Sequence, residues 1–268
     1  MATVMSKSSA SSNRQAVLFR AIAPWGFPVL VVLAWQWASS EGLLQSTVLP
    51  APLDVIKAAK ELSDTGELWD NLAISFWRAA VGFIIGASLG LVLGLLTGLS
   101  RVGETLFDSS LQMLRNIPSL AIIPLVIMWF GIGEWAKIFL VVFGTLFPVY
   151  LNTYHGIKSV DKGLIEMGRN YGLTRWGLLR YIILPGALSS ILVGVRYALG
   201  VAWIVLIVAE TIAASSGIGY LAMNAREFLR TDVVVLSIVL YAILGKLTDW
   251  LAKLAETRWL RWHPSYQR

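Results

Sequence analysis

The sequence contains no cysteine and only two histidines, His155 and His263, which stand more than a hundred residues apart. Without cysteine there is no disulfide bond, zinc–thiolate site or thiol nucleophile. A metal site needs several ligands that converge, and two isolated histidines do not indicate one. We therefore expect no metal ion and no cysteine chemistry in this chain.

Charged residues are also scarce, at 14% of the 268 residues, whereas 56% are hydrophobic. A soluble domain has roughly 25% charged residues, and disordered or coiled-coil chains need still more charge. The apolar residues gather into long charge-free runs, as a bilayer requires. The composition therefore predicts an integral membrane protein.

Six apolar runs approach the roughly 20 residues that a helix needs to cross about 30 Å of hydrocarbon. They are Ala21–Ser40, Ala79–Ser100 (which starts nearer Leu72), Asn116–Gly133, Ile138–Leu151, Ala187–Ala213 and Val233–Trp250. We predict an all-α transmembrane domain over residues 21–262, with tails at 1–20 and 263–268. The basic, serine-rich start could also belong to a cleaved signal peptide. No convincing small-residue cleavage site follows the first run, so we expect a retained anchor.

The basic residues behind the net charge of +6 are unevenly distributed between the predicted loops. With the N-terminus inside, the inner segments 1–20, 101–115, 152–185 and 251–268 carry fourteen Lys and Arg residues. The outer segments 41–71, 134–136 and 214–231 carry four, against eight acidic residues. This positive-inside bias predicts that both termini are cytoplasmic. It also explains the excess charge without nucleic-acid binding, which we do not expect.

Glycine recurs at every fourth position of the second run. The positions are Gly82, Gly86, Gly90, Gly94 and Gly98. Small residues at this spacing let another helix backbone approach closely, so we favour helix packing over a pore-lining role. In the acidic segment 41–71, Pro50 and Pro52 introduce a helix-like stretch to about Leu62, which we expect to lie on the outer membrane surface.

The longest inner loop, residues 152–185, has the pattern of two short helices. Gly172 suits the left-handed C-cap that would end the first helix. The Thr174 hydroxyl can cap the second helix, which should stop before Pro185. A membrane protein does not need thirty-odd structured residues merely to turn around. From these residues alone, docking of a soluble partner and simple cover of the membrane surface are equally open.

Within this loop, Glu166 is followed after five residues by Gly172, and after nine more by Ile182-Ile183-Leu184-Pro185. This spacing resembles the "EAA" loop of permease subunits in bacterial ABC importers, whose coupling helices sit in a cleft of a cytoplasmic ATPase. The family's two alanines are Met167 and Gly168 here, a mild departure. The resemblance implies a set of ATPase-coupling residues: Glu166, Gly168, Gly172, Ile182, Leu184 and Pro185.

The resemblance extends from about residue 20 to 262 and implies the six-helix fold of type I ABC importer permeases. A narrower likeness to the sulfonate, taurine and nitrate branch, closest to aliphatic sulfonate permeases, lies in residues 112–118, 129–133, 209–210 and 217–221. It implies a homodimer in the bacterial inner membrane, two cytoplasmic ATPase subunits and an extracytoplasmic binding protein. The sequence lacks a phosphate-cradling Gly-x-x-x-x-Gly-Lys-Ser/Thr loop. We therefore expect no enzymatic activity here, and expect the partner ATPase to bind ATP and Mg.

Three residues of the fifth run, Arg196, Trp203 and Glu210, are spaced seven apart and so lie close to one helical stripe. Charges inside a span are costly and usually face a cavity or a partner, which makes these residues candidates for the translocation path. Arg196 could bind a sulfonate through forked hydrogen bonds. The alternative, which we favour, is that Arg196 pairs with a carboxylate elsewhere or lies near the cytoplasmic boundary.

Other charged residues lie near the ends of the runs. Arg78 is expected at the outer edge of the second run, and Lys246 and Asp249 near the inner end of the sixth. Long side chains at such positions reach the interface with water, so we expect all three to be partly solvated.

The expected function is transport of aliphatic sulfonates by the membrane subunit of an ATP-driven importer. The same machinery could instead carry taurine, nitrate or a pyrimidine vitamin precursor. A secondary transporter would need no ATPase, but it should show internal repeats, which are not evident. A membrane enzyme would need clustered catalytic groups, and the two charges of the fifth run are four turns apart.

Overall fold

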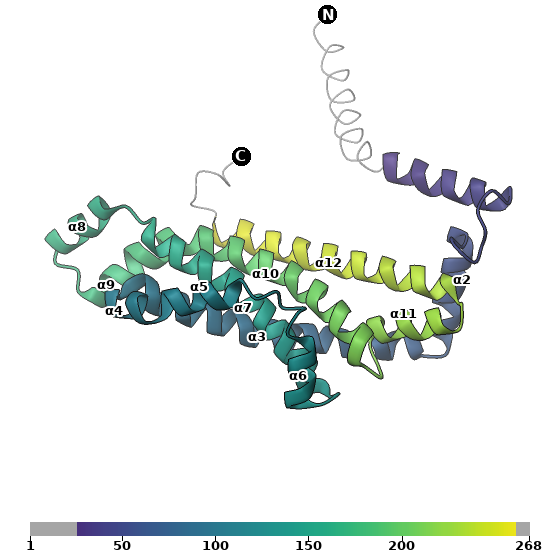
Figure 1. The fold of residues 1–268 in the computed structure, drawn as a ribbon. Helices are drawn as coiled ribbons and strands as arrows, with labels where there is room; N and C mark the ends of the chain where they lie inside the picture. The colour runs from purple at the N-terminus through teal and green to yellow at the C-terminus, as the bar shows by residue number, and fades with distance from the viewer. Residues whose placement is uncertain (1–25, 261–268) are drawn as a thin grey trace, which may run out of the picture.

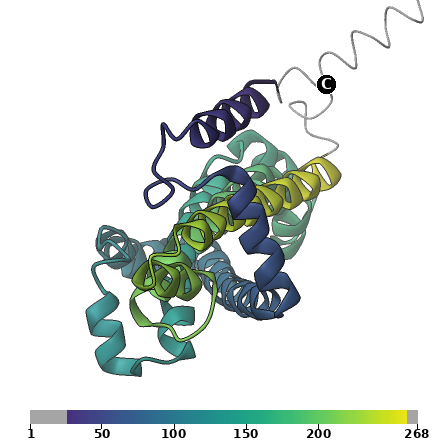
Figure 2. The same ribbon diagram turned by 90° about the vertical axis from the view of Figure 1, so that its right-hand side faces the viewer.

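The computed structural model describes residues 26–260, and every regular element within them is a helix. Four long helices run side by side (Figure 1): α3 (Glu67–Leu99), α7 (Glu134–Lys158), α10 (Leu184–Ala213) and α12 (Thr231–Trp259). Short helices occupy the two ends of this bundle: α2 (Pro52–Asp64) and α11 (Ile218–Glu227) at one, α8 (Lys162–Asn170) and α9 (Arg175–Leu178) at the other. Figure 2 looks along the long helices from the end that carries α2 and α11.

Four of the six predicted runs coincide with helices that are long and apolar enough to cross a membrane. These helices have 33, 25, 39 and 29 residues, the third being continuous from α9 to the end of α10. The first predicted run is described only from residue 26, as a helix over 26–40. Its role as a retained anchor stays a prediction. The predicted tails and His263 lie outside the described residues.

α7 lies at the centre of the bundle, between α3 and α10. In its most apolar window 56% of the residues are buried, against 17% in α12. The difference identifies α12 as a peripheral helix, with much of its apolar surface left for lipid or another chain. The predicted outer helix is present as α2, which begins with Pro52 in its first turn.

The third predicted run, Asn116–Gly133, is not one helix, and that expectation is wrong. Residues 116–122 form turns, and only α6 (Ile123–Phe130) is helical. Pro118 disfavours helical backbone in the residue before it. Pro124 occupies the first turn of α6, where its missing N–H leaves no hydrogen bond unmade. The apolar composition of this run concealed the break.

The preceding residues, expected to be an inner loop, are also helical. They form α4 (Arg101–Gly103), the π turn η1 (Glu104–Asp108) and α5 (Ser109–Arg115). This stretch runs antiparallel to α7, because Glu104 accepts a hydrogen bond from Lys158 Nζ at 2.7 Å, and Asp108 accepts one from Tyr150 Oη at 2.8 Å. Charges that made the segment resemble a loop therefore have polar partners on α7. The helical segment that contains the third predicted run thus begins near residue 101 and is broken at residues 116–122.

The glycines at every fourth position of α3 lie against α7. A Cβ atom added to Gly82 would come within 2.6 Å of Val141 Cβ, and one added to Gly94 within 2.6 Å of Thr153 Cβ. At the end of α3, a Cβ on Gly98 would lie 2.9 Å from Ile157 Cδ1. The two backbones are therefore closer than any side chain at these positions allows, which is the packing mode that the small-residue spacing predicts.

Candidate functional site

The first candidate site is the end of the bundle formed by α8, α9 and the π turn η2 (Leu179–Ile183), which we call the loop platform. α8 begins after Asp161, whose side chain accepts a hydrogen bond of 2.7 Å from the Gly163 N–H. α8 ends at Asn170, and two residues later Gly172 has a φ of +81°, the left-handed conformation predicted for it. The Leu173 N–H then bonds back to the Gly168 carbonyl at 3.0 Å. Local sequence thus fixes both ends of α8.

The second helix of the loop platform begins where the sequence predicts and ends differently. The Thr174 hydroxyl accepts a 3.2 Å hydrogen bond from the Gly177 N–H, as expected of an N-cap. The helix does not stop before Pro185, however, and that expectation is wrong. The chain continues through η2 directly into α10, where Pro185 lies in the first turn. A π turn accommodates a residue that cannot donate the regular backbone hydrogen bond.

Gly168 determines how α8 packs on the rest of the loop platform. A Cβ atom at this position would lie 2.5 Å from Ile182 Cδ1 and 2.8 Å from Leu178 Cδ2. Since both neighbours are partly or wholly buried side chains, a larger residue would push α8 away from η2. The glycine that replaces an alanine of the family pattern therefore permits a close helix crossing.

The outer surface of the loop platform exposes several large apolar side chains. Tyr171 and Trp176 are 83% and 67% exposed, and Leu164 and Met167 are about half exposed. Glu166 is exposed beside Met167, and the two line a shallow pocket with Tyr171. Large apolar side chains gathered on one exposed surface indicate an interaction site.

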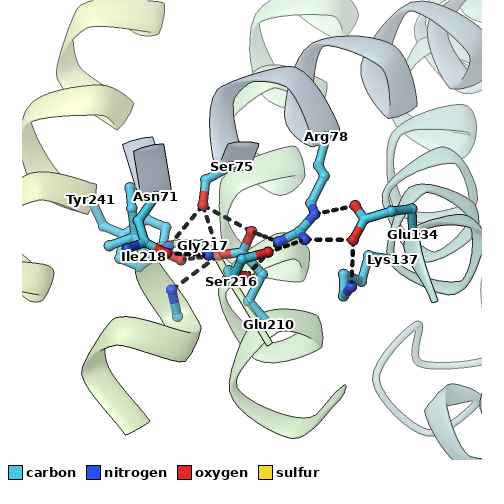
Figure 3. A network of polar contacts seen from close by, with 11 residues as sticks. Asn71, Ser75, Arg78, Glu134, Lys137, Glu210, Ser216, Gly217, Ile218 and Tyr241 are labelled. Atoms are coloured by element: carbon cyan, nitrogen blue, oxygen red, sulfur yellow. Dashed lines mark hydrogen bonds and ion pairs between the residues drawn. The ribbon is translucent and has the colours of Figure 1, made fainter. Parts of the chain in front are cut away.

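A second candidate site is a buried ion network at the opposite end of the bundle (Figure 3). The Arg78 guanidinium donates to both carboxylate oxygens of Glu134 at 2.6 Å and to Glu210 at 2.8 Å. It also donates to the carbonyl and hydroxyl of Ser216 at 2.7 and 2.9 Å. Arg78 is wholly buried, so the expectation that it reaches the water interface is wrong. Ion pairs with the carboxylates of Glu134 and Glu210 take the place of its hydration by water.

Glu210 accepts hydrogen bonds from residues of three helices, α3, α11 and α12. Besides Arg78, its donors are the Ser75 hydroxyl at 2.8 Å, the Gly219 N–H at 3.0 Å and the Tyr241 hydroxyl at 3.0 Å. The network therefore joins α3, α7, α10, α11 and α12 (Figure 3). Glu210 is 1% exposed, and in this conformation its carboxylate faces protein rather than a path.

At the same end of the bundle, side chains of α3 hold the residues at the start of α11. The Gly217 N–H donates to Asn71 Oδ1 at 2.6 Å, and the Ile218 N–H donates to Ser75 Oγ at 2.9 Å. Asn71, Ser75 and Arg78 fall on one face of a helix, three and four residues apart. Sequence reasoning missed this polar stripe, although its spacing within an otherwise apolar run is a usable signal.

The other two residues of the predicted translocation stripe have different surroundings. Trp203 is 4% exposed and packs edge-to-face with Tyr241, their ring centroids being 6.3 Å apart. Arg196 is 36% exposed and donates to Asp249 at 2.7 Å. It also lines a cavity of about 400 Å³ with Tyr197. Carboxylate pairing of Arg196 matches the alternative that the sequence analysis favoured, while its part in transport stays a prediction.

Comparison with known proteins identifies the family. The family model for the "Binding-protein-dependent transport system inner membrane component" matches residues 86–261, from the middle of α3 past the end of α12. The chain belongs to this family. It is therefore the membrane component of a transport system, and we call it the permease below. Within residues 26–260 no cluster of His, Cys, Asp and Glu could hold a metal ion.

Named relatives match the permease over nearly its whole length. The aliphatic sulfonates transport permease protein SsuC of Escherichia coli K12 is 64% identical, over 91% of this chain and 93% of the relative. The protein of the same name in Bacillus subtilis 168 is 45% identical, over 90% and 87%. The taurine transport system permease protein TauC of E. coli K12 is 34% identical, over 89% and 88%.

Solved structures show the same fold. An amino acid ABC transporter chain superposes with a TM-score of 0.63 at 20% identity, covering 75% of this chain and 97% of that chain. An inward-facing MetNI methionine ABC transporter chain gives 0.52 at 20% identity, over 71% and 94%. At this identity the likeness concerns the fold, which is that of type I ABC importer permeases.

Proposed function

We propose that the permease carries aliphatic sulfonates across the bacterial inner membrane as the membrane subunit of an ATP-driven importer. The observation that carries this proposal is the 64% identity, along nearly the whole chain, to a protein named for aliphatic sulfonate transport. Taurine is the main alternative among substrates, since a taurine permease is 34% identical. Nitrate and a pyrimidine vitamin precursor are weaker alternatives.

The loop platform supports coupling to a separate ATPase. Its exposed aromatic and aliphatic side chains are held in place by the Gly172 turn and by the close crossing at Gly168. We assign the coupling role to Glu166, Gly168, Gly172, Ile182, Leu184 and Pro185. Two cytoplasmic ATPase subunits would bind ATP and Mg, and an extracytoplasmic binding protein would deliver the sulfonate. The permease would act as a homodimer with both termini cytoplasmic, consistent with the excess of basic residues in the predicted inner segments.

Of Arg196, Trp203 and Glu210, we assign Arg196 to the translocation path. It is partly exposed and borders a cavity, whereas Trp203 and Glu210 are buried in this conformation. Its guanidinium has donors beyond those that it offers to Asp249, so it could also bind an anionic head group. Movement of α10 during transport would be needed for Trp203 or Glu210 to join the path.

Growth on sulfonate tests the substrate. A strain deleted for the gene should fail with a short alkanesulfonate as sole sulfur source and grow normally with sulfate. Plasmid-borne permease should restore growth. Normal growth of the deletion strain, with no second importer present, would refute the sulfonate assignment and move the substrate to one of the alternatives.

A matched pair of variants tests the coupling turn. Gly172→Val places a β-branched residue at φ +81°, whereas asparagine tolerates this conformation. No atom lies within 4 Å of an added Cβ at Gly172, so the backbone is the main difference between the two. Gly172→Asn should retain sulfonate-dependent growth and ATPase association, and Gly172→Val should lose both. Equal function of the two variants would refute the role of this turn.

A further inference from the structure

Arg115, the last residue of α5, lies near the middle of the membrane-spanning bundle. Eleven residues separate it from Glu104, which pairs with Lys158 at the end of α7. That separation corresponds to about 16 Å of helix, while the 25 residues of α7 span about 37 Å. One turn before Arg115, Leu111 packs beside Phe147 and Tyr150, in the central part of α7. Arg115 is therefore far from both ends of the bundle.

A cation at this depth needs a polar environment, because transfer of an arginine to the centre of a bilayer is unfavourable by at least a few kcal/mol. Arg78 and Arg196 both have carboxylate partners. Arg115 makes no ion pair or side-chain hydrogen bond within the described residues, and its side chain is exposed. The missing environment must come from outside this chain.

The backbone that follows points to the same conclusion. Residues 116–122 are non-helical, and 116–118 are exposed. At membrane depth such backbone is tolerated only where it is buried in protein or lines a water-filled cavity, because lipid cannot satisfy its N–H and C=O groups. Because the helix break and the unpartnered Arg115 lie at the same depth along the bundle, they indicate a water-filled passage beside α5.

We propose that Arg115, contributed by each of two permease copies, lines the central passage and binds the anionic head group of the substrate during translocation. This inference rests on the proposed function. A guanidinium offers a planar fork of donors that matches the oxygens of a sulfonate. Met113, Leu114 and Ile117 are exposed next to it and provide apolar surface for an aliphatic tail. The segment thus presents both halves of an aliphatic sulfonate with a matching surface.

Transport by the complete importer tests this role. The permease, its ATPase and its binding protein are reconstituted in liposomes, and uptake of radiolabelled ethanesulfonate is measured. Loss of a charge-assisted hydrogen-bond pair lowers kcat/KM by about tenfold to a hundredfold, which is the result expected for Arg115→Gln. Arg115→Lys keeps the charge and should recover part of the loss. Arg101→Gln, at the start of the same broken helix, is the matched control and should transport normally.

Assembly and basal ATP hydrolysis separate a binding role from a structural one. Both should be unchanged in the Arg101→Gln control, and Arg115→Gln should assemble as that control does, because the partner proposed for Arg115 is the substrate and not another subunit. Uptake within twofold of wild type, or loss of assembly in both the Gln and the Lys variants, would overturn the inference. Failure of the wild-type importer to take up ethanesulfonate would instead refute the proposed function.

The absence of cysteine permits a second measurement. Arg115→Cys carries the only thiol of the permease, and thiolates react only where water reaches them. A negatively charged methanethiosulfonate should label this residue in the assembled importer. No labelling would place the residue in lipid or in a dry interface and would overturn the inference.

Discussion

Removal of the Arg78 charge is the sharpest test of what holds together the end of the bundle that carries α2 and α11. Methionine is a good replacement, because it preserves much of the buried length of the side chain while removing every donor. In Arg78→Met, Glu134 keeps Lys137 as a partner at 3.0 Å. Glu210 keeps the Ser75, Gly219 and Tyr241 donors but loses the one cation that pairs with it within residues 26–260.

The size of the effect follows from the burial of the pair. Arg78 and Glu210 side chains are both 0% exposed and 2.8 Å apart. Breaking a buried ion pair by removing one partner costs about 3–5 kcal/mol, since an uncompensated charge is left behind. The exposed pair between Lys57 and Asp54 is the matched control, with side chains 77% and 46% exposed. Its loss in Lys57→Ala should change stability by less than about 1 kcal/mol.

Unfolding in mixed micelles with increasing SDS, followed by tryptophan fluorescence, measures the difference. Arg78→Met should unfold at a clearly lower SDS fraction than wild type. Arg78→Lys should fall between them, because a lysine cannot reach both carboxylates with a planar fork. If Arg78→Met were within about 1 kcal/mol of wild type, the network would not stabilise this end of the bundle, and our reasoning would be refuted.

Three further predictions concern packing and the loop platform. Gly94→Ala should lower the SDS midpoint, because its Cβ would lie 2.6 Å from Thr153 Cβ, whereas Gly200→Ala, with no atom within 4 Å, should leave it unchanged or raise it. Thr174→Val removes an N-cap and should reduce stability by about 1 kcal/mol, which lowers the SDS midpoint and leaves transport measurable; an unchanged midpoint would argue against the cap. Trp176→Ala should weaken ATPase association in a pull-down without changing permease stability, since the side chain is 67% exposed. Equal recovery of ATPase would exclude this residue from the docking surface.

Local sequence patterns determined much of this protein. Apolar runs of sufficient length located α3, α7, α10 and α12, since a helix that crosses a bilayer must satisfy its backbone internally and present apolar side chains. Gly172 and Thr174 fixed the turn between the short helices, because positive φ and N-capping depend on one residue and its near neighbours. The glycine spacing of α3 indicated close packing without naming the partner helix.

Tertiary structure decided where the charges go. The Arg78–Glu210 pair joins residues 132 positions apart, and nothing near Arg78 in the sequence indicates that it pairs with a carboxylate of α10. Likewise, the charges of Glu104 and Asp108 indicated a loop in the sequence, whereas in the structure these residues bond to Lys158 and Tyr150 of α7. Burial of a charge depends on groups that folding brings from distant parts of the chain. Hydrophobicity is a property of the segment itself, so the sequence located most spans, and only the fold revealed which charges lie inside them.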